Sequence, residues 1–429
     1  CALTWGVCAT SRRICEGGLM QTACTDAAYG PDYEARELRC DGLDNDCDGL
    51  VDTAAPEHSS LPLLANAETR VVPFTGGFLA VRVSQELRVA ESGAERPFAS
   101  VYFQPLSSTL QPAGEQVTLH ALESRIDRWQ VVSHGGSAFL LWTDEVDALR
   151  QPRIARIDPG VSLATPQVGL AARAAPTPPG ASQVRAALSG DGQHLLLAWR
   201  ANEAVRGQGF SPALEPQTSD VQLSGPLPEG TVAFALSGFD VAPRGPSGFS
   251  VLWAHGARDA PLSERLRVGF RRLSSALQPE GEDVTRLSDA GYLLELQLAG
   301  SAREDVAPVA AWITSALPPA SSASFDSTRT VHVTHPATPE GVTSSMRPVD
   351  ARMDLLRTTE DQPLLAISPT SSGLALRRIE PAGLGPSQWS AFFGSAHPVS
   401  LVPDREPGWT RVVCGARAPL PLVARACSL

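Results

Sequence analysis

The chain has 429 residues, of which 43% are hydrophobic and 19% are charged, as in an ordinary globular protein. Its formal net charge of -11 repels phosphate backbones and we find no local basic patch, so a nucleic-acid partner is excluded. All 35 basic residues are arginine, which excludes chemistry that needs a lysine, such as Schiff-base formation. No apolar run approaches the ~18 residues that a membrane-spanning helix needs.

Six of the eight cysteines crowd into the first 47 residues, as is typical of a short segment stabilised by disulfides in an oxidising compartment. Zinc is the alternative, but this segment has no Cys-x-x-Cys pair and no histidine. Acylation of the first cysteine, as in a lipoprotein, would leave one of the six unpaired. We therefore predict a secreted or cell-surface protein in which the first six cysteines pair among themselves and the last two pair with each other. The first six are Cys1, Cys8, Cys15, Cys24, Cys40 and Cys47, and the last two are Cys414 and Cys427.

Residues 44–52 read Asp-Asn-Asp-Cys-Asp-Gly-Leu-Val-Asp. A calcium loop of the EF-hand type places oxygen ligands at positions 1, 3 and 5, a glycine at 6, a backbone carbonyl at 7 and a further ligand at 9. Ala55 stands at position 12, where an EF-hand has glutamate, so we expect a weak site suited to extracellular Ca²⁺. The alternative is an Asp/Gly-rich turn that binds nothing. The predicted Ca²⁺ ligands are Asp44, Asp46, Asp48, the carbonyl of Leu50, and Asp52.

Residues 40–49 read Cys-Asp-Gly-Leu-Asp-Asn-Asp-Cys-Asp-Gly, with Tyr33 and Glu34 upstream. This pattern resembles the MopE-type metal-binding motif of bacterial secreted and surface proteins, over about the first 52 residues. Its aspartate spacing is also similar to that of thrombospondin type 3 calcium repeats. The resemblance implies metal binding and a surface location, and the family label suggests copper. Because copper favours His, Cys or Met ligands and the loop offers carboxylates and carbonyls, we expect Ca²⁺.

The rest of the chain repeats a short apolar run that ends in tryptophan. Trp142, Trp199, Trp253 and Trp312 close four such runs at spacings of 57, 54 and 59 residues. Weaker copies end at Val81, Ile367 and Val413, which makes seven. Each run lies between further segments in which apolar and polar residues alternate and which end at Gly or Pro. This pattern favours strands over helices. We expect the tryptophans to pack between neighbouring units.

Four short strands in each unit of about 50 residues are typical of a β-propeller. The predicted fold class is all-β: a seven-bladed β-propeller preceded by a small, disulfide-rich, loop-dominated calcium-binding module. The module is assigned to residues 1–56, a linker to 57–60 and the propeller to 61–429. We expect residues 61–64 to close the ring by lying beside residues 420–426 in one sheet.

The sequence contains no metalloprotease helix motif, nucleophile elbow or phosphate loop. With 8 histidines and 4 tyrosines spread over the chain, we predict that the protein is not an enzyme. The predicted function is that of an extracellular or cell-surface calcium-binding protein whose propeller binds, or acts as a scaffold for, a protein or glycan partner. The alternative is a secreted propeller enzyme that acts on a polysaccharide or peptide. Clustered carboxylates, histidine or tyrosine at one end of the central channel would distinguish the two.

Overall fold

The computed structural model describes the greater part of the chain. The described residues are 1–16, 19–35, 39, 43–47, 53–58, 67–74, 76–89, 95–122, 125–134, 136–146, 149–158, 173–174, 182–201, 204–225, 231–233, 238–257, 266–288, 292–315, 329–335, 344–346, 353–357, 363–367, 373–380, 383–392, 399–403, 409–414 and 422–427. Within these residues no helix is long and apolar enough to cross a membrane.

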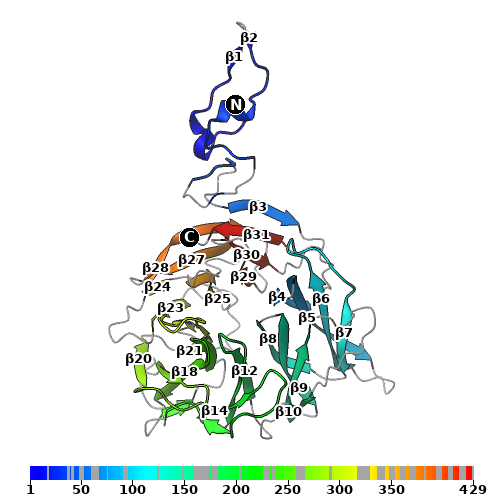
Figure 1. Ribbon diagram of the computed structural model, residues 1–429, viewed down its shortest axis with the longest axis vertical. Coiled ribbons are helices and arrows are strands. Elements are labelled where there is room, and N and C mark those ends of the chain that lie inside the picture. The colour runs from blue at the N-terminus through cyan, green and yellow to red at the C-terminus, as the bar shows by residue number, and fades with distance from the viewer. Residues whose placement is uncertain are drawn as a thin grey trace.

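The N-terminal segment has little regular structure and protrudes from the rest of the molecule (Figure 1). It comprises the 3₁₀ helix η1 (Gly6–Thr10), the hairpin strands β1 (Cys15–Glu16) and β2 (Leu19–Met20), and the one-turn helix α1 (Asp26–Tyr29). Two disulfides, Cys1–Cys24 and Cys8–Cys47, hold this segment together. A short segment with so few buried side chains depends on such cross-links, as the sequence predicts.

Beyond this segment the fold is all-β, as predicted, and consists of antiparallel sheets that follow one another along the chain. The first three described sheets each have four strands. They are β4 (Ala67–Phe74), β5 (Gly77–Val89), β6 (Glu95–Leu106) and β7 (Val117–Leu122); β8 (Arg125–His134), β9 (Ser137–Val146), β10 (Leu149–Ile157) and β11 (Arg173–Ala174); and β12 (Ser182–Leu188), β13 (Leu195–Ala201), β14 (Ala204–Phe210) and β15 (Val221–Gln222).

The next three sheets continue in the same order, and the first of them has an additional short strand. They are β16 (Thr231–Ala233), β17 (Phe239–Arg244), β18 (Gly248–Ala257), β19 (Leu266–Leu273) and β20 (Val284–Ser288); β21 (Tyr292–Ala299), β22 (Val309–Ser315), β23 (Thr330–Thr334) and β24 (Ser344–Met346); and β25 (Met353–Arg357), β26 (Pro363–Ile367), β27 (Gly373–Glu380) and β28 (Gly383–Phe392).

The last described sheet combines the two ends of the chain. It is formed by β29 (Val399–Pro403), β30 (Trp409–Cys414), β31 (Leu422–Cys427) and the N-terminal strand β3 (Thr53–His58). In this sheet β3 pairs with β31 in an antiparallel register. The prediction that an N-terminal segment completes the last sheet is confirmed, but residues 61–64 were the wrong segment. Those residues lie outside the described part, and residues 53–58, which we expected at the end of the module and in the linker, form the strand.

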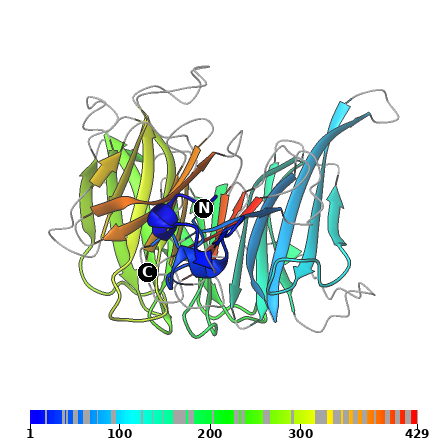
Figure 2. The same cartoon turned by 90° about the horizontal axis from the view of Figure 1, so that it is seen from above.

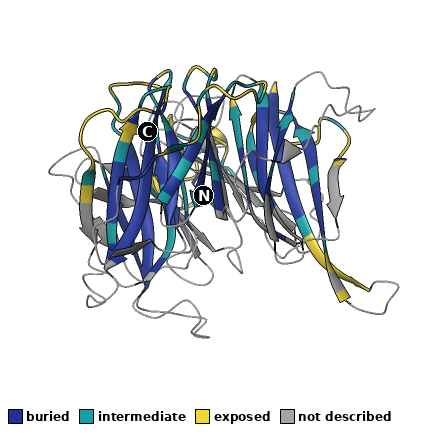
Figure 3. Ribbon diagram, turned by 90° about the horizontal axis from the view of Figure 1, so that it is seen from below, coloured by how far each residue is buried: buried dark blue, intermediate teal, exposed yellow. Residues whose placement is uncertain are grey.

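The sheets lie around a common centre, and their innermost strands are β4, β8, β12, β17, β21, β25 and β29 (Figures 1 and 2). The innermost strands contact one another in succession from β4 to β29, and β29 in turn contacts β4. In six of the described sheets the innermost strand pairs on one side only, so its other edge faces the centre. The burial pattern in Figure 3 follows this arrangement, with buried residues in the strands and exposed residues at the tip of the β5–β6 hairpin.

The four tryptophans occupy the interior between successive sheets, as predicted. Trp142, Trp199 and Trp312 are at most 1% exposed and Trp253 is 5% exposed. Trp142 packs with residues of the sheet before its own, and Trp312 does the same three sheets later. In the first sheet the position equivalent to the tryptophans is held by the buried Arg82 and not by Val81. Arg82 follows Val81, which lies opposite Arg70 on β4, just as Trp142 follows Leu141, which lies opposite Gln130 on β8.

Candidate functional site

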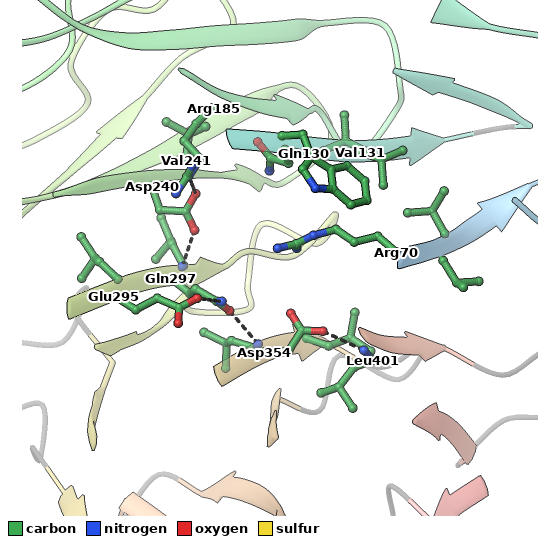
Figure 4. A pocket seen from close by; sticks show the side chains of 18 residues that line it. Arg70, Gln130, Val131, Arg185, Asp240, Val241, Glu295, Gln297, Asp354 and Leu401 are labelled. Atoms are coloured by element: carbon green, nitrogen blue, oxygen red, sulfur yellow. Dashed lines mark hydrogen bonds and ion pairs between the residues drawn. The ribbon is translucent and has the colours of Figure 1, made fainter. Parts of the chain in front are cut away.

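A cavity of about 460 Å³ lies at the centre of the molecule, where the innermost strands meet (Figure 4). Its walls come from β4, β8, β12, β17, β21, β25 and β29, so that segments far apart in the sequence contribute to one site. Most of these strands place a polar or charged side chain in the cavity, although each strand otherwise buries apolar residues. Its polar and aromatic lining residues are Arg70, Trp129, Gln130, Arg185, Asp240, Glu295, Gln297 and Asp354.

Asp240 is the most buried of the three carboxylates, with 9% of its surface exposed. Its Oδ2 accepts a hydrogen bond of 2.8 Å from the backbone N–H of Leu298, and its Oδ1 lies 3.6 Å from Nε of Arg185. Burial raises the pKa of Asp240 to about 6, and the neighbouring Arg185 and the Leu298 N–H oppose this rise. The carboxylate therefore titrates closer to neutrality than an exposed aspartate does.

Glu295 and Asp354 lie close enough to influence each other. Burial raises the pKa of Glu295 to about 7, and the charge of Asp354 contributes to the rise. Burial also raises the pKa of Asp354 to about 6. Glu295 accepts hydrogen bonds from the amide of Gln297 at 2.7 Å and from the backbone N–H of Met353 at 3.2 Å. Asp354 accepts one of 2.7 Å from the backbone N–H of Leu401.

Arg70 extends from β4 into the cavity between these carboxylates (Figure 4). Its positive charge lowers the pKa of Asp240, Glu295 and Asp354, so one guanidinium acts on all three. The guanidinium carbon also lies 5.5 Å from the ring centroid of Trp129, within the range of a cation–π contact. The site thus combines two arginines, three carboxylates, two amides and one aromatic ring.

Among the described residues, no group of three or more His, Cys, Asp or Glu side chains is placed to hold a metal ion. Of the predicted calcium ligands, Asp44 and Asp46 are described, whereas Asp48, Leu50 and Asp52 lie outside the described residues. Asp44 is buried, its backbone carbonyl accepts a hydrogen bond from Val7, and Cys47 joins the loop to Cys8. Burial raises the pKa of Tyr33, and the negative charges of Asp26 and Asp46 add to the rise.

The predicted cysteine pairing needs two corrections. Cys15 is exposed and carries a free thiol, so the six N-terminal cysteines do not all pair; Cys40 lies outside the described residues. In the β30–β31 register Cys414 pairs with Leu422 and Cys427 pairs with Trp409, which places the two cysteines at opposite ends of the strand pair. Five strand positions correspond to ~17 Å, whereas a disulfide needs Cα atoms within about 7 Å. The predicted Cys414–Cys427 bond is therefore wrong for this register.

Comparison with family models and with curated proteins finds no match. Solved structures do resemble the chain in fold. The polysaccharide lyase Uly1 matches 89% of this chain and 93% of its own at 7% identity, with a TM-score of 0.47. The Dos1 propeller matches 87% and 92% at 9% identity with a TM-score of 0.39. A luciferin-regenerating enzyme matches 68% and 88% at 10% identity with a TM-score of 0.31.

The prediction that the protein is not an enzyme is contradicted by these neighbours, because a lyase and a luciferin-regenerating enzyme are among them. Catalytic motifs consist of residues close together in sequence, whereas the cavity collects single polar residues from strands about 55 residues apart. An available signal was an acidic residue inside an otherwise apolar strand, as in Phe-Asp-Val-Ala at 239–242 and Met-Asp-Leu-Leu at 353–356.

Proposed function

We propose that residues 53–427 form a seven-bladed β-propeller closed by β3, and that the protein binds a glycan in the cavity on the propeller axis. The observation that carries this proposal is the convergence of polar side chains from several sheets on one cavity of about 460 Å³. Ligand sites typically have this size and place a few polar groups to fix the orientation of the ligand. Propellers commonly enclose such a central channel.

A glycan is favoured because its hydroxyl groups both donate and accept hydrogen bonds. The cavity offers acceptors on Asp240 and Asp354, donors on Arg70, and both kinds of group on Gln130. The two disulfides are consistent with a setting outside the reducing cytoplasm, at the cell surface or in secreted form, where glycans are abundant partners. A protein partner docked on the loops is the competing binding function.

The experiment is a glycan-array screen of the full chain, followed by calorimetry on each glycan that binds. Asp354→Ala removes one cavity carboxylate, and the loss of a hydrogen bond to a charged group lowers the affinity for a neutral glycan by about 10- to 100-fold. The control is Asp305→Ala, whose side chain is 69% exposed and paired with Arg303 on the surface. A bound glycan whose affinity is the same in wild-type and Asp354→Ala would place its site outside the cavity.

Hydrolysis of a glycosidic bond is a second candidate function, favoured by the titration of two neighbouring carboxylates. With pKa values of about 7 for Glu295 and about 6 for Asp354, one group can hold a proton near neutrality while the other is ionised. Acid–base catalysis of glycoside cleavage uses such a pair. Reducing ends released by wild-type but not by Glu295→Gln would support it, and binding without cleavage would exclude it.

The N-terminal loop is the proposed Ca²⁺ site. The alternating aspartates from residue 44 onward and the Cys8–Cys47 disulfide that fixes the loop support it. Asp44 and Asp46 would contribute carboxylate oxygens, and a hard cation would neutralise the negative charge of the loop. Calorimetry with CaCl₂ should give binding heat that Asp46→Ala abolishes and Asp305→Ala preserves. Tight binding of Cu²⁺ without any response to Ca²⁺ would refute this assignment.

A further inference from the structure

One polar residue occupies the same position in the innermost strand of successive sheets, and we call these residues the axial ring. Each lies opposite the residue that precedes the tryptophan position of its sheet. Gln130, for example, lies opposite Leu141, which precedes Trp142, and Asp240 lies opposite Leu252, which precedes Trp253. The axial ring comprises Arg70, Gln130, Arg185, Asp240, Gln297 and Asp354, all of which line the cavity.

Four members of the axial ring accept a hydrogen bond from the innermost strand of the next sheet. For Gln130, Asp240 and Gln297 the donor is the backbone N–H of the residue that follows the ring member of the next sheet. For Asp354 the donor is the backbone N–H of Leu401 on β29. Gln130 accepts from Ala186 at 2.9 Å, Asp240 from Leu298 at 2.8 Å, Gln297 from Leu355 at 2.8 Å and Asp354 from Leu401 at 2.7 Å. An innermost strand has one edge without a partner strand, and these side chains satisfy its N–H groups.

The remaining two members, Arg70 and Arg185, cannot form this contact. A guanidinium group carries only donors, so it cannot accept a hydrogen bond from Val131 or Val241, the equivalent N–H groups on the next strands. A glutamine or aspartate at these positions would join the sheets as the other four members do. A residue that departs from the structural pattern shared by its neighbours is typical of a functional position.

The carboxylates and the arginines of the cavity therefore have different roles: the carboxylates connect neighbouring sheets, and the arginines are placed to bind a ligand. Each carboxylate already binds a backbone N–H of the next sheet, whereas the arginines direct donor groups toward the cavity. Arg70 reaches farthest, passing the Trp129 ring into the space between the carboxylates (Figure 4). Arg185 lies 3.6 Å from Asp240 at the side of the same space.

We propose that Arg70, assisted by Arg185, is the receptor for a carboxylate group, and that the ligand of the axial cavity is an acidic glycan. This inference rests on the proposed glycan-binding function. The planar guanidinium forms two parallel hydrogen bonds to a carboxylate, which no other side chain does as well. A neutral hydroxyl would be bound equally well by glutamine, which could also have kept the contact between sheets. The choice of arginine is explained by a negative charge on the ligand.

The charge of the cavity sets the pH dependence of binding. The charged groups that face Arg70 are Arg185 from β12, Asp240 from β17, Glu295 from β21 and Asp354 from β25. With all of them ionised, two arginines against three carboxylates leave one negative charge. As the pH falls through about 7 and about 6 the carboxylates take up protons while the arginines stay charged, so the sign reverses. Affinity for an acidic glycan should rise as the pH falls from 8 to 5.5.

The test is calorimetry of the full chain with a galacturonic acid oligosaccharide and with a neutral galactose oligosaccharide of the same length, at pH 5.5 and 8. Arg70→Gln should weaken binding of the acidic oligosaccharide by about 10- to 100-fold. The same variant should unfold at the same or a higher temperature than wild-type, because glutamine can accept the hydrogen bond from Val131. Arg303→Gln, at an arginine whose side chain is 60% exposed, is the matched control.

The outcomes separate this inference from the function on which it rests. Stronger binding of the neutral oligosaccharide, or acidic binding that Arg70→Gln leaves unchanged, overturns the inference and keeps the glycan-binding function. Binding of neither acidic nor neutral glycans overturns both. Binding of an acidic peptide in place of the acidic oligosaccharide refutes the proposal that the ligand is a glycan. Should Arg70→Gln fail to fold, Arg70 has a structural role, and the arginine-receptor inference is refuted.

Discussion

Replacing Asp354 by asparagine should make the protein more stable, and by an amount that depends on pH. Burial raises the pKa of Asp354 to about 6 from the model-peptide value of 3.8, a difference of about 2 pH units. One unit corresponds to ~1.4 kcal/mol, so ionising this group in the folded state costs up to ~3 kcal/mol more than in the unfolded chain. Asparagine keeps an oxygen that can accept the Leu401 N–H, and it carries no charge.

The direction follows from proton uptake. Because the pKa is raised in the folded state, the folded protein holds more protons than the unfolded chain between about pH 4 and pH 6. The stability contributed by this group is therefore complete below about pH 4, falls as the pH rises through 6 and is constant above that. Wild-type and Asp354→Asn should have equal stability near pH 3.5, and the variant should be more stable by up to ~3 kcal/mol at pH 8.

Urea denaturation followed by tryptophan fluorescence, at pH values from 3.5 to 8, measures this difference. Glu215→Gln removes an exposed carboxylate far from the cavity and controls for the loss of one negative charge; surface changes of this kind usually stay within ~0.5 kcal/mol. Asp354→Leu removes the acceptor altogether and should destabilise the protein at every pH. A difference between wild-type and Asp354→Asn that does not vary with pH would falsify the assignment of Asp354 as a buried, titrating group.

Further predictions concern packing, the free thiol and ring closure. Trp312→Ala should lower the free energy of unfolding by ~3–5 kcal/mol because it empties a fully buried site between two sheets, whereas Trp5→Ala, at a side chain 66% exposed, should have little effect; equal effects would contradict the packing role. Cys15→Ser should lower by one the number of thiols that react with Ellman's reagent in the native protein, and an unchanged number would mean that Cys15 is paired. A chain starting at residue 59 should melt at a lower temperature than one starting at residue 48, because only the first lacks β3 and exposes the edge of β31; identical melting would refute closure by β3.

The sequence supports the strand pattern well because apolar runs, alternation and turn residues are local signals. The shared turns show this clearly. Residues 106–112 and 273–279 are similar in sequence, and in the structure Leu110 and Leu277 have the same left-handed backbone conformation and buried side chains. A third turn at residues 210–216 has the same geometry at Leu214, with a different sequence before it. Local chemistry therefore predicted these elements correctly.

Long-range pairing was harder to predict, because two segments can carry equally suitable strand patterns. Residues 61–64 looked like the closing strand because they are apolar, whereas the strand that pairs with β31 contains Pro56 and Glu57. A strand at the outer edge of a sheet needs few apolar residues and tolerates proline, so hydrophobicity is a poor guide there. The same holds for Cys414 and Cys427, where proximity in sequence suggested a bond that the strand register excludes.

The candidate site could not be predicted from motifs because its residues lie in different sheets. These residues nevertheless recur at the same position of successive sheets. The tryptophans and the axial ring occupy adjoining positions of paired strands, and they serve opposite needs. The tryptophans fill the space between sheets, and the ring residues satisfy the N–H groups that the inner edges leave facing the axis. In this chain every innermost strand except β29, which contributes Leu401, places a polar side chain at the centre, so a polar cavity follows from this arrangement. At two ring positions, Arg70 and Arg185, a donor replaces the acceptor that would join neighbouring sheets. We therefore assign ligand binding to these two positions.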